Sequence, residues 1–129
     1  MSSPGSLNIS GTDFVTVFVT DFDAATEFYG TTLGLPCSAK YGQIEGAEFE
    51  TGTLTLQVIT SDMVPFDVTP SKHPIALHVD DVDAGRAELE SRGVSFQADT
   101  MDSGVCKMAF FEDPEGNALM LHHRYAPKG

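Results

Sequence analysis

The chain has 129 residues, enough for one domain or for two small halves that share a core. Because 41% of the residues are apolar, the chain can bury that core without stabilising disulfide bonds or metals. Its formal charge of −12, from 19 acidic residues against 7 lysines and arginines, argues against nucleic-acid binding, which needs clustered cations, and suits a cationic ligand. Two cysteines form no disulfide framework, and no segment resembles a signal peptide or a membrane span, so we expect a soluble, cytoplasmic protein.

The first half of the chain is predicted to begin with a strand and a helix. Val15, Val17 and Val19 alternate with polar or aromatic neighbours, the period-2 pattern of a strand, and Asp21 offers its side chain as a helix N-cap. After a flexible tail at 1–11, the expected elements are a strand at 13–20, a helix ending at Gly34, one or two short strands within 41–50 and a strand at 54–58. A proline-containing connector follows at 61–74.

The second half repeats this order with a period near 60 residues. The expected elements are a strand at 75–80, a helix at 82–92, a strand at 94–98, a loop at 99–104, a strand at 105–112, a turn at 113–116 and a strand at 118–123. The sequence therefore predicts β-α-β-β-β twice, and because neither half is large enough to bury its own sheet, the two must share a core.

Twin βαβββ modules resemble the vicinal oxygen chelate superfamily, which includes glyoxalase I, extradiol dioxygenases, fosfomycin-resistance enzymes and bleomycin-resistance proteins. The motifs that carry the resemblance are residues 19–29 with Leu33-Gly34-Leu35, then residues 78–82, and the turn of residues 111–117, Phe-Glu-Asp-Pro-Glu-Gly-Asn. The resemblance implies an α+β fold in which two modules curl mixed sheets around a shared cavity. It also implies one domain at 12–129, with module 1 at about 12–62 and module 2 at about 73–125, and a homodimer.

Metal-dependent members of that superfamily usually place ligands on the first and last strands of each module. The matching positions here hold Phe14, Pro74 and Met120, with Thr55 or Gln57 as the fourth. These side chains cannot replace the histidine and glutamate ligands of a divalent cation. We therefore predict no metal or other cofactor at that centre, and a resemblance to the metal-free, bleomycin-resistance-like members.

Strand parity then predicts what lines the cavity. The helix-facing set should be the apolar one: Val15, Val17, Val19, Leu54, Leu56, Val58, Ile75, Leu77, Val79, Leu119 and Leu121. The opposite faces carry Phe14, Thr16, Phe18, Gln57, His78, Met120 and His122, and the resemblance adds Cys106, Met108 and Phe110. Such an aromatic, sulfur-rich face suits a small organic ligand. The alternative for each of these side chains is that it packs in the core and contacts no ligand.

Three functions remain open at this point. The first is a protein that sequesters a small aromatic or amphipathic compound. The second is a lyase, isomerase or dioxygenase-like enzyme that uses His78 and His122 as acid and base. The third is an enzyme with a displaced divalent metal on His78, His122 and Cys106. The strand order also places Cys106 roughly opposite His122. A neighbouring imidazolium would lower the thiol pKa that burial alone would raise, and the alternative is an inert buried cysteine beside two structural histidines.

Overall fold

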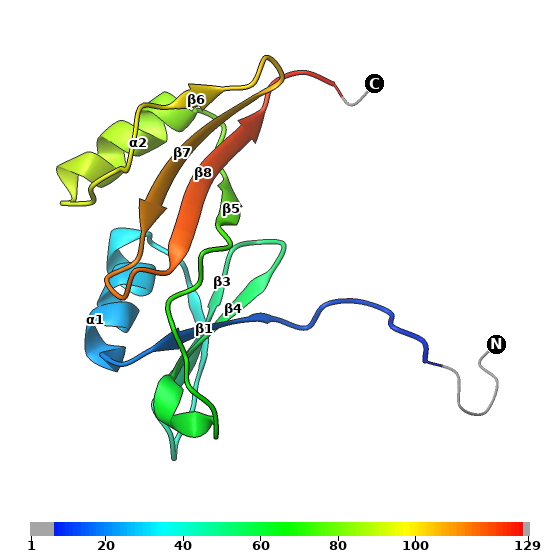
Figure 1. Ribbon diagram of the computed structural model, residues 1–129, viewed down its shortest axis with the longest axis vertical. Helices are drawn as coiled ribbons and strands as arrows, with labels where there is room; N and C mark the ends of the chain where they lie inside the picture. Colours follow the sequence, from blue (N-terminus) through cyan, green and yellow to red (C-terminus); the bar gives the residue numbers. More distant parts are fainter. Residues whose placement is uncertain (1–6, 128–129) are drawn as a thin grey trace.

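The computed structural model describes residues 7–127, which form two modules that each follow the order β-α-β-β-β (Figure 1). The first module contains β1 (Val15–Val19), α1 (Phe22–Glu27), the π-helical turn η1 (Phe28–Thr32), β2 (Cys37–Lys40), β3 (Gly46–Glu50) and β4 (Thr55–Thr60). After the 3-10 turn η2 (Ser61–Met63), the second contains β5 (Ile75–His78), α2 (Val82–Ser91), β6 (Met101–Asp102), β7 (Cys106–Glu112) and β8 (Ala118–Arg124). The predicted α+β class with a repeated module is confirmed; most of the predicted tail lies outside the described residues.

Each module builds one four-stranded mixed sheet, in the orders β1-β4-β3-β2 and β5-β8-β7-β6. The first strand of each module runs parallel to the last, and the other pairs are antiparallel. Both helices begin in the same way, because Asp21 and Asp81 each accept a hydrogen bond of 3.0 Å from the amide three residues later.

The predicted strand at 94–98 is wrong. Within that segment only Phe96 forms a bridge, to Phe111, and β6 lies instead inside the region predicted as a loop. The segment lies between α2 and β7 and is held by both. Arg86 of α2 donates to the Ala98 carbonyl at 2.7 Å, and its guanidinium lies 4.9 Å from the centre of the Phe96 ring. On the other side, the Gln97 amide donates to the Phe110 carbonyl of β7 at 2.9 Å.

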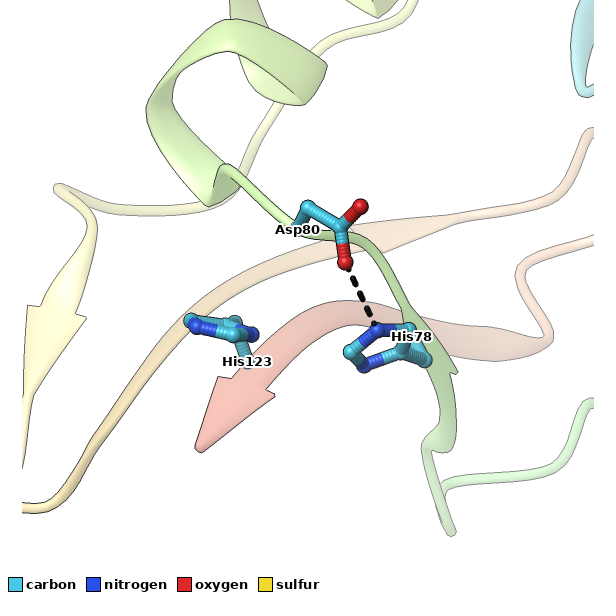
Figure 2. A group of neighbouring side chains, drawn as sticks. All are labelled: His78, Asp80 and His123. Carbon is cyan, nitrogen blue, oxygen red and sulfur yellow. Dashed lines mark hydrogen bonds and ion pairs between the residues drawn. The ribbon is translucent and has the colours of Figure 1, made fainter. Parts of the chain in front are cut away.

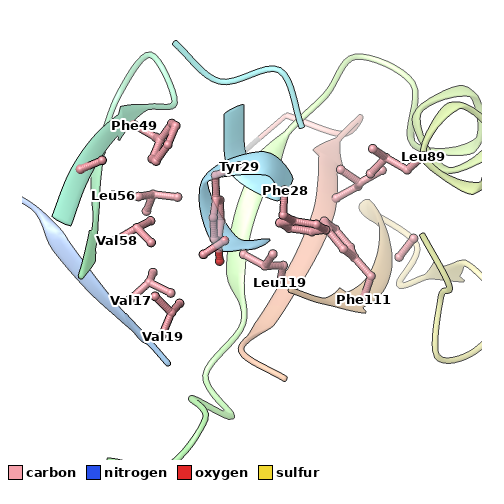
Figure 3. Close-up of a cluster of buried hydrophobic side chains, with 14 of the residues drawn as sticks. Val17, Val19, Phe28, Tyr29, Phe49, Leu56, Val58, Leu89, Phe111 and Leu119 are labelled. Atoms are coloured by element: carbon pink, nitrogen blue, oxygen red, sulfur yellow. The ribbon is translucent and has the colours of Figure 1, made fainter. Parts of the chain in front are cut away.

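The two modules share one hydrophobic core, as their size predicted. All eleven residues of the predicted helix-facing set lie in it or pack against it. The turn η1 joins its two parts (Figure 3): Tyr29 faces sheet residues of the first module, with its ring centre 6.1 Å from that of Phe49, whereas Phe28 faces Phe111 of the second at 6.4 Å. The adjacent residues Phe28 and Tyr29 therefore pack against different sheets, so the two modules have one continuous hydrophobic core.

The turn between β7 and β8 connects the modules through polar contacts. Its Asp113 is buried and accepts four hydrogen bonds: Oδ1 from the amides of Glu115 and Asn117, and Oδ2 from the Asn117 side chain and the Tyr29 hydroxyl, the last at 2.8 Å. Asn117 also donates to the Phe18 carbonyl of β1, at 3.2 Å. A buried carboxylate is costly unless it is fully hydrogen-bonded, so this arrangement requires both modules in place.

Two ionisable groups at this connection have altered pKa values. Burial, together with the charge of Asp113, raises the pKa of Tyr29 far above its ordinary range, so the phenol stays a donor. For Glu115, burial acts to raise the pKa, but hydrogen bonds from the Asp21 amide and the Thr20 hydroxyl, both 2.9 Å, lower it on balance. The carboxylate of Glu115 thus fastens the turn to the start of α1.

Among the described residues, no helix has the length and apolarity needed to cross a membrane.

Removing the Tyr29 hydroxyl should destabilise the fold. We expect Tyr29→Phe to lower the free energy of unfolding by about 1.5–3 kcal/mol, the usual contribution of a hydrogen bond to a charged group. The matched control is Tyr125→Phe, which removes a hydrogen bond of 2.6 Å to Asp102 from a side chain that is 48% exposed. That variant should stay within about 0.5 kcal/mol of the wild type. Urea unfolding measures both, and equal effects would contradict a special role for the buried bond.

Candidate functional site

The sheet faces opposite the core carry the predicted ligand-binding residues, and we call these two faces together the open face. Cross-strand partners share a face, so the register defines the open face without reference to side-chain detail. In the first module the register aligns Thr16, Gln57 and Glu48, and in the second it aligns Ala76, Met120 and Phe110. Both helices lie on the other side of the sheets (Figure 1).

The part of the open face in the first module is polar. The Thr16 hydroxyl donates to Gln57 Oε1 at 2.8 Å, Gln57 Nε2 donates to the Tyr41 hydroxyl at 3.0 Å, and that hydroxyl donates to Glu48 Oε2 at 2.5 Å. Desolvation and the hydrogen bond to Glu48 raise the pKa of Tyr41 above its ordinary value. These four side chains form one chain of hydrogen bonds that ends in a carboxylate.

Tyr41 and Glu48 were not among the residues predicted from the sequence. Glu48 could have been found, because Ala47 and Phe49 alternate with it and both lie in the core. Tyr41 lies outside any strand, and its position depends on Gly46. A Cβ atom at Gly46 would collide with the Tyr41 ring, 2.8 Å from Cε2, so glycine is required for the ring to lie there.

The part of the open face in the second module is apolar. Met108, Phe110 and Met120 are half-buried, and His122 lies directly opposite Met108 across the β7–β8 ladder. In the first module, Phe14 precedes β1 and is 43% exposed, and Phe18 contacts Phe66 edge to face with ring centres 6.4 Å apart. In the predicted set of seven ligand-binding residues, the first module therefore supplies the polar Thr16 and Gln57 together with Phe14 and Phe18, and the second supplies the apolar Met108, Phe110 and Met120.

A hollow of about 290 Å³ opens between the modules where β1 and β5 begin, and it is lined by residues of both, including Thr16, His73, Pro74 and Asn117. Asn117 belongs to the connecting turn, so the contact that joins the modules also borders this hollow.

The predicted position of Cys106 opposite His122 is wrong. Cys106 faces Arg124, whose Nη1 lies 3.9 Å from the sulfur, and His122 faces Met108. The cause is the turn: β7 and β8 pair from Glu112 and Ala118 onward, which leaves five residues between the strands and shifts the register by two from the predicted one. The buried thiol therefore has a guanidinium, not the predicted imidazole, as its cross-strand neighbour.

His78 and His122 lie on neighbouring strands, as predicted, and the structure aligns them in the parallel β5–β8 ladder. Its side chain, however, extends past the end of β5. Its Nε2 lies 3.1 Å from Asp80 Oδ1, and its ring centre is 5.7 Å from that of His123 (Figure 2). The partner of His78 is thus a histidine that the sequence analysis did not select.

The positions that the family resemblance assigns to a metal do not offer a suitable donor set. Phe14 and Pro74 have no side-chain donor atom, Met120 offers only a thioether, and the Gln57 amide is engaged by Thr16 and Tyr41. A hard or borderline cation needs imidazole nitrogen or carboxylate oxygen at such positions. The chemistry of these residues does not fit the usual centre.

Comparison with known proteins identifies the superfamily to which this chain belongs. The sequence profile of the Glyoxalase/Bleomycin resistance protein/Dioxygenase superfamily matches residues 11–121, and the chain belongs to this superfamily. Among curated proteins it is similar to the uncharacterized protein YraH of Bacillus subtilis strain 168, with 26% identity over 120 residues that cover 84% of this chain and 94% of YraH.

Solved structures show the same fold. One is TnmS3, an antibiotic binding protein from Streptomyces sp. CB03234, with 26% identity, a TM-score of 0.73 and coverage of 92% of this chain and 99% of TnmS3. Another is a superfamily member from Sphaerobacter thermophilus, with 22% identity, a TM-score of 0.77 and coverage of 88% and 97%. The second comparison, at this identity, establishes the fold alone.

The hydrogen bond between Tyr41 and Glu48 can be tested by titration. Glu48→Gln removes a negative charge and a charge-assisted hydrogen bond, both of which raise the pKa of Tyr41, so that pKa should fall toward its ordinary value of 10.0. Phenolate absorbance against pH measures the change, and Tyr41→Phe identifies which of the observed tyrosine transitions belongs to Tyr41. An unchanged Tyr41 transition in Glu48→Gln would contradict the contact.

Proposed function

We propose that this protein binds and sequesters a small aromatic or amphipathic organic molecule, preferably a cation, on its open face. The observation that carries the proposal is the division of that face into a half-exposed aromatic and thioether part and a hydrogen-bonded part that ends in Glu48. Binding sites for organic molecules commonly combine apolar walls with a few placed polar groups.

The apolar part supplies the affinity in this proposal. Met108, Phe110 and Met120 remain half-buried although they lie side by side on β7 and β8. Thioethers are polarisable and adaptable, and they pack well against aromatic rings of varied shape. A planar ligand that covers these side chains would bury apolar area that the isolated chain leaves in water.

The polar part supplies the charge preference. Glu48 accepts a hydrogen bond from Tyr41, whose hydroxyl also accepts one from Gln57, so the carboxylate is fixed in place without a cationic partner in that chain of hydrogen bonds. The formal charge of −12 adds a long-range attraction for cations. The proposal is supported by the likeness to TnmS3, a protein described as antibiotic-binding.

We further infer that binding needs no metal at the family's usual positions, because Phe14, Pro74, Met120 and Gln57 lack its donor set. We also propose that the protein acts in the cytoplasm, where its two free cysteines would stay reduced.

We propose that the protein is a homodimer, in which a second copy covers part of the open face. Twofold pairing is the commonest assembly of small proteins, and the half-exposed side chains on the strands are of the kind that such pairing buries. Analytical ultracentrifugation at micromolar concentration should give the mass of two chains. The mass of one chain would rule the dimer out under those conditions.

Dye binding tests the ligand preference directly. Acridine orange, a planar cation, should bind more tightly than the anionic dye ANS at about 0.15 M salt, where long-range attraction is screened. Met120→Ala and Glu48→Gln should each weaken acridine orange binding by about tenfold, corresponding to about 1.4 kcal/mol. Fluorescence titration gives the dissociation constants, and urea unfolding confirms that each variant is folded.

Two matched controls separate this site from non-specific attraction to an acidic protein. Glu27→Gln removes the same charge from α1, on the core side of the sheet, and Met63→Ala shortens an exposed methionine in η2. Neither should change the dissociation constant. Equal weakening by Glu27→Gln and Glu48→Gln would show that net charge alone attracts the dye, and the proposed site would be rejected.

A further inference from the structure

A second cluster of chemically capable side chains lies at one end of the second sheet, where β5 and β8 end beside the start of α2. His78 is the last residue of β5, Asp80 follows two residues later, and His123 is the second-last residue of β8. By register His123 faces Lys107, on the other side of the sheet from His122 and Met108. His78 is aligned with His122, but its side chain lies beside Asp80 and His123 at the end of β5, so the cluster does not include the proposed ligand-binding residues Met108, Phe110 and Met120.

The three side chains are already close together (Figure 2). One ligand atom from each lies within 4.8 Å of the others, and His78 Nε2 is 3.1 Å from Asp80 Oδ1. Zinc bonds of about 2.0–2.1 Å place tetrahedral ligand atoms about 3.3 Å apart, so a modest closure is needed. His78 and Asp80 can supply it, because their side chains are 68% and 99% exposed.

A second observation points to a missing partner. His123 Nδ1 is buried and has no hydrogen-bond partner in the described structure. Buried polar atoms are nearly always satisfied, and a metal-bound imidazole is one means of satisfying them. The contact between His78 and Asp80 supplies no hydrogen-bond partner for this buried His123 nitrogen.

The surroundings favour a cation. The hollow that His123 borders, of about 490 Å³, is lined by four aspartates, Asp80, Asp81, Asp83 and Asp102, against one lysine, Lys107. Three of these aspartates already have partners: Asp81 caps α2, Asp83 pairs with Lys107 at 2.9 Å, and Asp102 accepts from Tyr125 and from a backbone amide. Asp80 is the one that pairs with none of these groups and contacts His78 instead. The first-turn acids also offset the positive end of the helix dipole.

We propose that His78, Asp80 and His123 form a binding site for a late first-row divalent transition metal, of which Zn²⁺ is representative. Two imidazoles and one carboxylate are the donors that such ions prefer, whereas Mg²⁺ prefers oxygen alone. None of the three residues occupies a position that the family resemblance assigns to a metal. Three protein ligands would leave a coordination position open to solvent.

Isothermal titration calorimetry of tag-free protein with ZnCl₂ tests the site. We expect one Zn²⁺ per chain, which a large excess of Mg²⁺ does not displace. The variants His78→Gln, Asp80→Asn and His123→Gln should each lose at least about tenfold in Zn²⁺ affinity, because even removal of a hydrogen-bond partner of a metal ligand costs that much. His122→Gln and His73→Gln are the matched controls and should retain wild-type affinity.

Co²⁺ provides an independent readout, because its visible absorption depends on its ligands. The spectrum of the Co²⁺-loaded wild type should be retained in His122→Gln and lost in His123→Gln. Because His78 and Asp80 are exposed, variants at these positions should fold even if His123→Gln does not. Unchanged Zn²⁺ affinity in His78→Gln and Asp80→Asn, equal losses in the control variants, or no Zn²⁺ binding would each overturn the proposal.

Discussion

The structure depends on the full hydrogen bonding of the buried carboxylate of Asp113. Two of its four hydrogen bonds come from backbone amides of its own turn, one from the Asn117 side chain and one from Tyr29 of the other module. Burial of such a group is costly unless it is hydrogen-bonded, so the loss of any of these donors destabilises the fold. The same Tyr29 fills the core of the first module, so polar pairing and apolar packing position the modules together.

This constraint also determines how the candidate site is assembled. Asn117 donates to the backbone of β1, the strand that carries Thr16, and the turn that contains it sets the register of β7 against β8. The turn thereby fixes the position of β1, which carries Thr16, relative to β8, which carries Met120. In this account, the Asp113–Asn117 motif is a structural element that fixes the geometry of the site.

Much of the fold could be predicted from the sequence, because strand parity and helix caps are local properties. The valines of β1, Leu56 of β4, the leucines of β8 and the cap at Asp21 all behave as predicted. The features that the sequence analysis missed or predicted wrongly depend on contacts between residues that are distant in the sequence. The segment 94–98, expected as a strand, is held by contacts from Arg86 and from β7, the register of Cys106 depends on the closure of a five-residue turn, and Tyr41 reaches the open face only because Gly46 leaves room.

The most direct test of the account is whether one ligand molecule contacts both parts of the open face. Protein labelled with ¹³C at its methionine methyls, of which the sequence has five, and at its tyrosine rings can be examined by NMR with bound acridine orange. The account predicts nuclear Overhauser contacts from the same dye to the methyls of Met108 and Met120 and to the ring of Tyr41, and none to Met63. Contacts to Met63, or to only one of the two parts, would contradict it.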